Sequence, residues 1–395
     1  MGRGCLLAGG GGLWIDEAAD AAEDVVDRVG SLDLAVHPSL QPVEARHYEK
    51  IEGNRVKCHL CPRGCEVGDV ERGYCGVREN RGGTYYTLVH SSPCAVHNDP
   101  IEKKPFAHVL PGTFSLSIAT AGCNVECRFC QNWQISQERP ENVPHAHLPP
   151  EEVVELARRH GSASIAFTYS EPVIFYEYMY DVARAAFPTG ILPVIVSNGY
   201  MTKKAWKDLL PHLGAVKVDL KGFTETYYRE MCDGELKPVL DGMRLVKAAG
   251  KWLEIVTLIL PGKNDSEKEN RALARWVRTY LGPDVPLHFS RFTPMYRMRN
   301  LPPTPVKTLE RLHEVARGEG LRFVYIGNVP GHKWESTYCP KCGEVAIRRV
   351  GFGIVENRLV NGACPKCGER IPGIWRKEDA LGLPNDRHAA QAKAS

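Results

Sequence analysis

The sequence predicts an α/β protein in which an open, partial barrel of parallel strands lies between two small cysteine-rich modules. Short β-branched apolar runs alternate with amphipathic helical segments between about residues 106 and 330, which is typical of successive βαβ units. Too few strands can be counted for a complete eight-fold barrel. Cysteines gather in a glycine-rich segment before this region and in two paired knuckles after it.

Length and composition are those of a folded protein with a full core. The 395 residues suit one large α/β domain plus smaller modules, and 43% hydrophobic content is ordinary. A formal charge of +3 is too near balance to indicate a dedicated nucleic-acid binder or a membrane-surface protein. The 14 cysteines fall in close pairs and triplets, which indicates metal ligation in a reducing compartment, so we expect a cytoplasmic protein without disulfides.

Residues 1–45 read as an appended extension. The first residues carry one positive charge and a short apolar run diluted by glycines, which makes a poor signal peptide and no membrane span. Residues 16–29 predict an acidic amphipathic helix, and irregular sequence follows it.

A cysteine-rich metal-binding module is predicted over residues 46–105. Cys58, Cys61, Cys65 and Cys75 lie in turn-like, glycine-rich sequence that is too small and polar to fold on apolar burial alone. Four thiolates suit either tetrahedral zinc or a fully ligated auxiliary 4Fe–4S cluster. An auxiliary cluster would relay electrons, whereas zinc would only hold the fold.

The barrel region spans residues 106–330. Its predicted strands and the helices between them are listed here by residue number: strands 115–120, 163–168, 193–197, 215–220, 253–260, 287–292 and 322–326, and helices 150–160, 173–186, 203–210, 237–249, 265–280 and 306–319.

A cysteine triad directly follows the first of these strands. Cys123, Cys127 and Cys130 form a Cys-x3-Cys-x2-Cys pattern. Three thiolates hold three irons of a 4Fe–4S cluster, and the fourth iron is left open to chelate the amino and carboxylate groups of S-adenosylmethionine and to deliver one electron to its sulfonium. The triad therefore predicts a radical enzyme. A zinc site, or a chance spacing of cysteines, is the alternative.

Polar side chains collect where the predicted strands end. In barrel-type α/β folds the chemistry gathers at the carboxyl ends of the strands. The candidates at this rim are Thr168, Ser170, Glu171, Ser197, Asn198, Asp219, Lys221, Thr257, His288 and Arg291.

Two of these candidates are predicted to act as a pair. Asp219 and Lys221 are two residues apart on a strand, so their side chains point to the same face. We expect them to contact the carboxylate and ribose of the cofactor, and we assign them the catalytic role. A purely structural ion pair is the alternative.

The other rim candidates are expected to bind the cofactor. Glu171 precedes Pro172, so it also suits the start of a helix. Ser197 and Asn198 either bind the cofactor or shape the turn before Gly199. Arg291 offers a bidentate fork for a carboxylate, whereas His288 is better explained as a satisfied buried histidine. 

Residues 331–375 predict a zinc-ribbon-like module. Cys339-Pro-Lys-Cys342-Gly and Cys364-Pro-Lys-Cys367-Gly are near-identical knuckles, for which a rubredoxin-like iron site is the alternative to zinc. Basic residues beside them suit nucleic-acid contact or ordinary solvated charge equally well. Residues 376–395 form a polar tail that we expect to fray.

The chain resembles radical SAM enzymes related to pyruvate formate-lyase activase. Besides the triad, the motifs that carry the resemblance are Asp99-Pro-Ile-Glu-Lys-Lys-Pro, Gln131-Asn-Trp, Tyr169-Ser-Glu-Pro, Ser197-Asn-Gly, Asp219-Leu-Lys and Gly327-Asn-Val-Pro-Gly. The chain is most similar to the AmmeMemoRadiSam branch, whose members also combine an amino-terminal cysteine module with a carboxyl-terminal double knuckle. The resemblance covers residues 48–375.

The resemblance implies a partial (β/α)6 radical SAM barrel and reductive cleavage of S-adenosylmethionine. Phe129 is then a neighbour of the adenine. Where the wider family has Gly-Gly-Glu-Pro, this chain has Tyr169-Ser170-Glu171-Pro172, which keeps the carboxylate but not the glycines. Where activases have Asp-Thr-Asn-Gly, it has Val196-Ser197-Asn198-Gly199, without the carboxylate that helps to hold a monovalent cation.

We therefore expect an iron–sulfur oxidoreductase that abstracts hydrogen from a protein or small molecule. A one-electron donor such as flavodoxin or ferredoxin is the expected partner. Two alternatives are a radical SAM enzyme that modifies RNA and a metal-rich interaction protein without activity, and the polar rim argues against the second of these.

Overall fold

The computed structural model describes residues 28–29, 32 and 34–381. The expected acidic helix therefore lies mostly outside the described residues. Its last two residues form strand β1 (Arg28–Val29), which pairs with β2 (Leu34–Ala35). No helix within the described ranges combines the length and apolar content needed to cross a bilayer.

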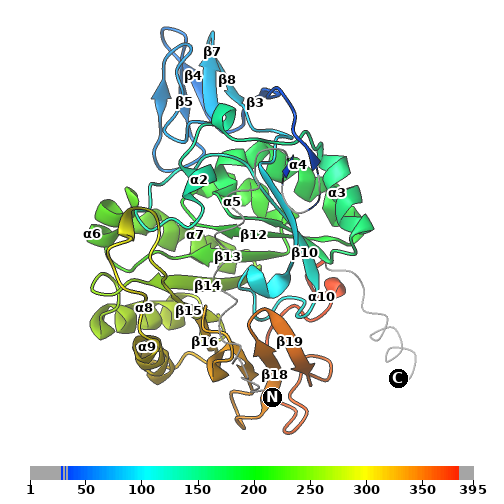
Figure 1. Cartoon of the computed structure of the whole chain (residues 1–395), viewed down its shortest axis with the longest axis vertical. Helices are drawn as coiled ribbons and strands as arrows, with labels where there is room; N and C mark the ends of the chain where they lie inside the picture. The colour runs from blue at the N-terminus through cyan, green and yellow to red at the C-terminus, as the bar shows by residue number, and fades with distance from the viewer. Residues whose placement is uncertain (1–27, 30–31, 33, 382–395) are drawn as a thin grey trace, which may run out of the picture.

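The centre of the molecule is an eight-stranded sheet whose strands follow one another in sequence order (Figure 1). Seven of the strands are parallel, as the sequence predicts: β10 (Phe114–Ala119), β11 (Ser164–Phe167), β12 (Leu192–Ser197), β13 (Ala215–Asp219), β14 (Trp252–Ile259), β15 (Leu287–Arg291) and β16 (Val324–Gly327). No pairing between described residues joins the two edge strands, so the barrel is open.

The remaining strand of the sheet was not predicted. Strand β9 (Ala95–Pro100) pairs antiparallel with β10, although it falls in the segment that the sequence assigns to the N-terminal module. Its polar composition and terminal proline hide a strand signal, and pairing with β10 supplies the stability that the sequence pattern does not indicate.

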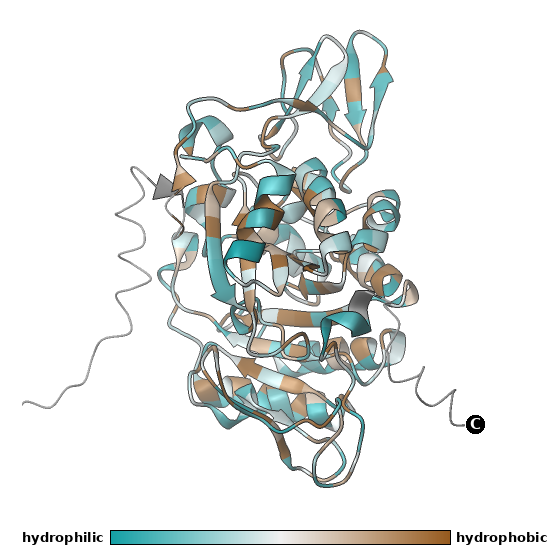
Figure 2. Ribbon diagram, turned by 90° about the vertical axis from the view of Figure 1, so that its right-hand side faces the viewer, coloured by the Kyte–Doolittle hydropathy of each residue, from teal (hydrophilic) through white to brown (hydrophobic). Residues whose placement is uncertain are grey.

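The predicted helices lie between the strands and cover the sheet: α3 (Pro150–Arg159), α4 (Tyr176–Ala186), α5 (Lys203–Leu209), α7 (Leu236–Ala248), α8 (Glu267–Tyr280) and α9 (Val306–Gly318). Local sequence fixes where they begin. The Thr202 hydroxyl accepts a hydrogen bond from Ala205 N at the start of α5, and the Ser266 hydroxyl accepts one from Glu269 N at the start of α8. Figure 2 shows hydrophobic and hydrophilic bands alternating along these elements.

The N-terminal module is built from two small antiparallel sheets, which lie at one end of the molecule (Figure 1). Their strands are β3 (Val43–Glu44), β8 (Thr84–Thr87) and β7 (Arg78–Arg81) in one sheet, and β4 (Tyr48–Ile51), β5 (Arg55–Cys58) and β6 (Glu66–Val67) in the other. A buried ion pair between Arg78 and Glu177 joins the module to helix α4, and the backbone N–H of Arg46 donates to Glu177 Oε1 at 2.5 Å.

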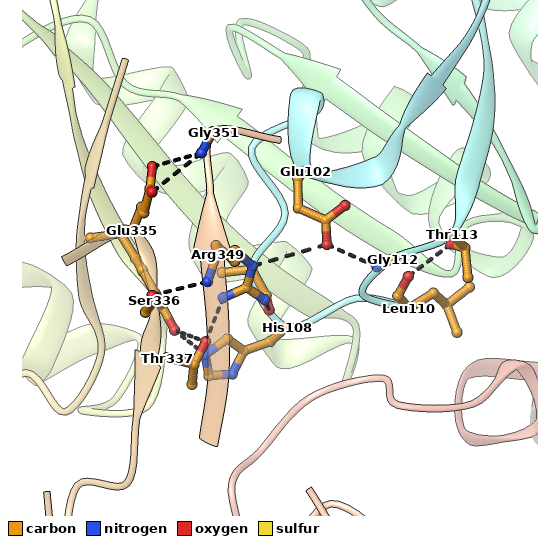
Figure 3. Close-up of polar contacts among 12 residues, drawn as sticks. Glu102, His108, Leu110, Gly112, Thr113, Glu335, Ser336, Thr337, Arg349 and Gly351 are labelled. Atoms are coloured by element: carbon orange, nitrogen blue, oxygen red, sulfur yellow. Dashed lines mark hydrogen bonds and ion pairs between the residues drawn. The ribbon is translucent and has the colours of Figure 1, made fainter. Parts of the chain in front are cut away.

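The C-terminal module docks at the opposite end of the barrel. It contains β17 (Thr337–Tyr338), β18 (Val345–Val350) and β19 (Gly353–Asn357). Figure 3 shows Arg349 between this module and the barrel: its guanidinium donates to Thr337 Oγ1 and to the carbonyl of Ala107, each at 2.7 Å, and lies 4.0 Å from Glu102. The module is therefore held by buried polar contacts.

Candidate active site

The cysteine triad lies on the loop between β10 and the short helix α2 (Trp133–Ser136), at the carboxyl end of the strand. The loop is anchored from the far side of the barrel, because Glu126 N donates to Cys232 O at 2.8 Å and Arg128 N donates to Met231 O at 2.9 Å. Backbone amides two residues after Cys123 and Cys130 donate to their sulfurs. Such donors stabilise thiolates, which are the form that binds iron.

The triad fits a cluster bound at three corners. The three thiols are electrostatic neighbours of one another. Their sulfur atoms do not, however, all lie within 4.8 Å of one another, as the ligands of a single metal ion would. Burial raises the pKa values of Cys123 and Cys130, so metal binding must displace their protons. Each cysteine sulfur that ligates a cubane binds a different iron, so these sulfurs lie further apart than the ligands of a single ion.

A fourth cysteine at this site was missed by the sequence analysis. Cys232 is buried, and its thiol is hydrogen-bonded to that of Cys127. It ends a π-helical turn, Tyr228–Cys232, and such turns are frequent at functional sites. No motif surrounds it, and it is more than a hundred residues from the triad in sequence, so only the fold reveals it.

Three of the predicted rim residues meet in one network. Glu171 Oε1 accepts from the Ser197 hydroxyl at 2.6 Å and from Val173 N at 3.0 Å, and Glu171 Oε2 accepts from Asn198 N at 2.8 Å. Burial raises the pKa of Glu171 to about 7, in spite of these donors. The carboxylate thus fixes the turn after β12 to the turn after β11.

The same network reaches the triad loop through Asn124. Its side-chain oxygen accepts from Asn198 Nδ2 at 2.8 Å, and its own Nδ2 donates to the carbonyl of Tyr200 at 2.8 Å. The side chain of Asn124 is buried. The position of the triad is therefore tied to the carboxyl ends of β11 and β12.

Asp219 and Lys221 form an ion pair beside the triad. Asp219 ends β13, and the two side chains retain 31% and 16% of their exposure. Lys221 lies within electrostatic reach of Cys127. Burial opposes the charged amine, but attraction to Asp219 outweighs it and raises the pKa of Lys221. A fixed cation with accessible surface is thus placed next to the cluster loop.

The other predicted residues make contacts of their own, separate from the Glu171 network. Arg291 Nε donates to the carbonyl of Thr304 at 2.9 Å. Phe129 is buried, and its ring packs 6.2 Å from that of Tyr227. Val256 pairs with Asp219, and Thr257 is the next residue on β14. Successive side chains of a strand point to opposite faces, so Thr257 points away from the face that carries Asp219.

His288 lies at the base of the barrel and not at the rim. It is the second residue of β15, and its Nε2 is 2.8 Å from Glu254 Oε2. Glu254 is fully buried, accepts from the backbone amides of Ala107 and His108 at 2.9 Å, and lies 3.5 Å from the amine of Lys217. These contacts make His288 part of a structural network.

A second polar group went unrecognised in the sequence. The amine of Lys104 is buried and donates to Asp99 Oδ2 at 2.6 Å and to the hydroxyl of Tyr169 at 3.0 Å, and Tyr169 also donates to Asp99. Tyr169 has φ of 63°, a left-handed backbone that glycine adopts without a steric cost. Its carbonyl accepts from Asn132 Nδ2 at 2.7 Å, which links it to the triad loop.

The C-terminal knuckles form a separate candidate metal site. Among the described residues, Cys339, Cys342, Cys364 and Cys367 are the one group of ligand atoms that all lie within 4.8 Å of one another. Two of the sulfur pairs are 3.6 and 3.7 Å apart. A tetrahedral ion with metal–sulfur bonds of about 2.3 Å requires sulfur separations of about 3.8 Å, so the group fits one metal ion.

Comparison with known proteins agrees with this site. Residues 117–274, which include the triad and the Asp219–Lys221 pair, match the profile of the Radical SAM superfamily. An uncharacterized protein of Methanocaldococcus jannaschii (MJ0808) is 43% identical over 330 residues, which cover 83% of this chain and 98% of that protein.

Solved structures also align with the chain. A radical SAM methyltransferase from Sphaerobacter thermophilus aligns at 15% identity and a TM-score of 0.42, over 80% of this chain and 82% of that one. A domain of the pyruvate-formate lyase-activating enzyme from Bacteroides vulgatus aligns at 17% identity and a TM-score of 0.38, over 42% and 99%.

Proposed function

Because the chain belongs to the radical SAM superfamily, we propose that it holds a 4Fe–4S cluster on Cys123, Cys127 and Cys130 and uses it to cleave S-adenosylmethionine. When bound, such a cluster supplies one electron to the sulfonium, which yields methionine and a 5′-deoxyadenosyl radical that abstracts hydrogen from a substrate. The observation that carries the proposal is the triad loop itself, which is fixed to the carboxyl ends of β11 and β12 and to the π-helical turn Tyr228–Cys232, and lies beside the Asp219–Lys221 pair.

The residues around the triad are assigned roles from their contacts. Lys221 provides a fixed cation for the carboxylate of the cofactor, and Asp219 holds that amine in place and accepts from the ribose hydroxyls. Glu171 acts mainly by ordering Ser197 and Asn198, because three protein donors already occupy its carboxylate.

We further propose that the chain belongs to the AmmeMemoRadiSam branch and takes hydrogen from a protein or small molecule, with flavodoxin or ferredoxin as the electron donor. The two cysteine modules that flank the barrel support this placement. We propose zinc for the C-terminal knuckles, supported by sulfur separations of 3.6 and 3.7 Å.

The test is anaerobic incubation of the reconstituted protein with S-adenosylmethionine and dithionite. We expect 5′-deoxyadenosine and methionine in equal amounts, and none from Cys127→Ala. Cys94→Ala is the matched control, because Cys94 is a buried cysteine that belongs to none of the three groups. An iron-loaded protein that gives no 5′-deoxyadenosine would contradict the proposal.

A further inference from the structure

Four cysteines of the N-terminal module are electrostatic neighbours of one another and are called the N-terminal quartet: Cys58, Cys61, Cys65 and Cys75. Cys58 ends strand β5, and its backbone N–H donates to the carbonyl of Cys65 at 2.9 Å. Gly64 N closes a turn onto the carbonyl of Cys61 at 3.2 Å. Cys75 comes from the loop before β7, and its thiol is an electrostatic neighbour of Cys58 and Cys65.

The quartet has the backbone environment of a metal site. Amides two residues after Cys58, Cys61 and Cys75 donate to the respective sulfurs. The same offset recurs at Cys123 and Cys130 of the triad. Amide donors at this offset orient a thiolate and offset part of its charge.

The distances between the quartet sulfurs bear on whether the quartet binds a single metal ion or a cluster. In the C-terminal knuckles the sulfurs approach to 3.6 and 3.7 Å, as one tetrahedral ion requires. The N-terminal quartet, whose residues are all described, is not drawn together in this way, and neither is the triad. Four cysteine sulfurs that lie further apart than the ligands of one ion are compatible with a cubane, in which each cysteine sulfur binds a different iron.

The quartet is surrounded by buried side chains. The guanidinium of Arg78 is buried and lies within electrostatic reach of Cys58 and Cys75. Fully buried apolar side chains, among them Val56 and Val77, lie in the same core cluster as the quartet cysteines. Arg78 is also paired with Glu177, so the quartet lies among apolar side chains beside a buried ion pair, not beside an unpaired cation.

The quartet also lies against the triad loop. Gly122, which precedes the first triad cysteine, packs on the backbone of Cys75. Arg63, from the quartet's own turn, donates to the carbonyl of Asn124 at 2.7 Å and pairs with Asp233. An open cavity of about 780 Å³ is lined by both Cys75 and Cys123.

We propose that the N-terminal quartet binds a second 4Fe–4S cluster, in which the protein ligates all four irons, immediately beside the cluster of the triad. Such a cluster has no open iron, so it does not bind S-adenosylmethionine. Its role rests on the proposed function: in its reduced form it gives one electron to the oxidised triad cluster, and an external one-electron donor, dithionite in vitro, reduces it again.

The test uses the full chain with the triad removed. Cys123→Ala/Cys127→Ala/Cys130→Ala, reconstituted anaerobically with iron and sulfide, is expected to retain about four irons and four sulfides per chain, with the Mössbauer signature of a cubane. The unaltered protein is expected to hold about eight irons. A triad variant with bound zinc and no iron, or with about two irons and two sulfides, would overturn the proposal.

Two further measurements guard against a misfolded variant. The first adds Cys61→Ser to the triad variant, which leaves three of the four quartet ligands. We expect this change to alter the Mössbauer spectrum of the quartet cluster and to leave the circular dichroism spectrum of the protein unchanged. The iron count of the unaltered protein is the second check, because about four irons with about two zinc ions would refute the second cluster without any mutation. Absence of 5′-deoxyadenosine would contradict the proposed function but would not change the metal content expected for the quartet.

Discussion

The carbonyl oxygen of Cys75 lies 2.8 Å from the position that a Cβ atom would occupy on Gly122. The loop that carries the triad and the loop that carries the N-terminal quartet therefore touch backbone to backbone. A glycine is required there for two reasons, since Val77 Cγ1 would lie 2.6 Å from the same Cβ and φ of Gly122 is 97°. The contact fixes the spacing of the two candidate metal sites.

Gly122→Ala is expected to push these loops apart. The substitution combines a left-handed backbone with two contacts shorter than real Cβ atoms show, so we expect a loss of about 2–4 kcal/mol in the free energy of unfolding and incomplete iron loading. Gly161→Ala is the control, because Gly161 has φ of 64° but nothing within 4 Å of its Cβ. The control should lose only about 1 kcal/mol and load iron fully. Equal effects would contradict the packing argument.

Lys221→Met is expected to weaken S-adenosylmethionine binding without removing iron. Loss of one charge-assisted hydrogen bond costs about 1.5–3 kcal/mol, so the dissociation constant should rise about ten- to hundred-fold. Equilibrium titration of the anaerobic protein measures this change. Lys237→Met, which removes an exposed i,i+4 partner of Asp241, should bind normally. Unaltered binding by the Lys221 variant would show that its ion pair is structural.

Arg349→Met is expected to loosen the C-terminal module. The guanidinium is buried and bonded to Thr337 and to the Ala107 carbonyl, so its loss should destabilise the fold by about 2–4 kcal/mol. Limited proteolysis should then cleave near residue 330 first. Arg348 lies next to it on β18 but is exposed, and Arg348→Met should resist proteolysis as the unaltered protein does.

His108 makes the stability of the barrel base depend on pH. Its Nδ1 lies 2.6 Å from the carbonyl of Pro372 and its Nε2 lies 2.6 Å from the Tyr325 hydroxyl, and burial lowers its pKa to about 4. Because the folded pKa is below the unfolded value of about 6.5, the unfolded chain binds the proton first. Stability from this group is present above pH 6.5 and is lost as the pH falls towards 4, by about 3 kcal/mol.

The measurement is the free energy of unfolding by urea between pH 7 and pH 4. His108→Gln is expected to be less stable at pH 7 and to lose less stability on acidification. His59→Gln is the control, because the His59 side chain is 42% exposed. If the free energy of unfolding of the His108 variant falls with pH as steeply as that of the unaltered protein, other groups cause the pH dependence.

The sequence predicts what local patterns encode. Alternation of apolar runs located the seven parallel strands and the helices between them, and cysteine spacing located the triad and the knuckles. Glu171, Ser197 and Asn198 were also predicted at strand ends, and they do meet, because the carboxyl ends of neighbouring parallel strands share one edge of a sheet.

What the sequence does not encode locally could not be predicted. Cys232 reaches Cys127 only through a π-helical turn, and Tyr169 meets Lys104 only because the chain folds β9 against β10. His288 is a satisfied buried histidine, as expected, but the sequence also groups it with the rim, whereas its position near the amino end of β15 brings it to Glu254 at the base. A side chain near the amino end of a strand lies at the base of the barrel, and one near the carboxyl end lies at the rim.

The central claim is that the triad leaves one iron open for S-adenosylmethionine. The most direct measurement is electron–nuclear double resonance of the dithionite-reduced protein mixed with S-adenosylmethionine that carries ¹⁵N in its amino group. We predict a ¹⁵N coupling to the reduced cluster that is present in the unaltered protein and absent from Cys123→Ala/Cys127→Ala/Cys130→Ala. A reduced cubane whose spectrum shows no ¹⁵N coupling in the unaltered protein would contradict it.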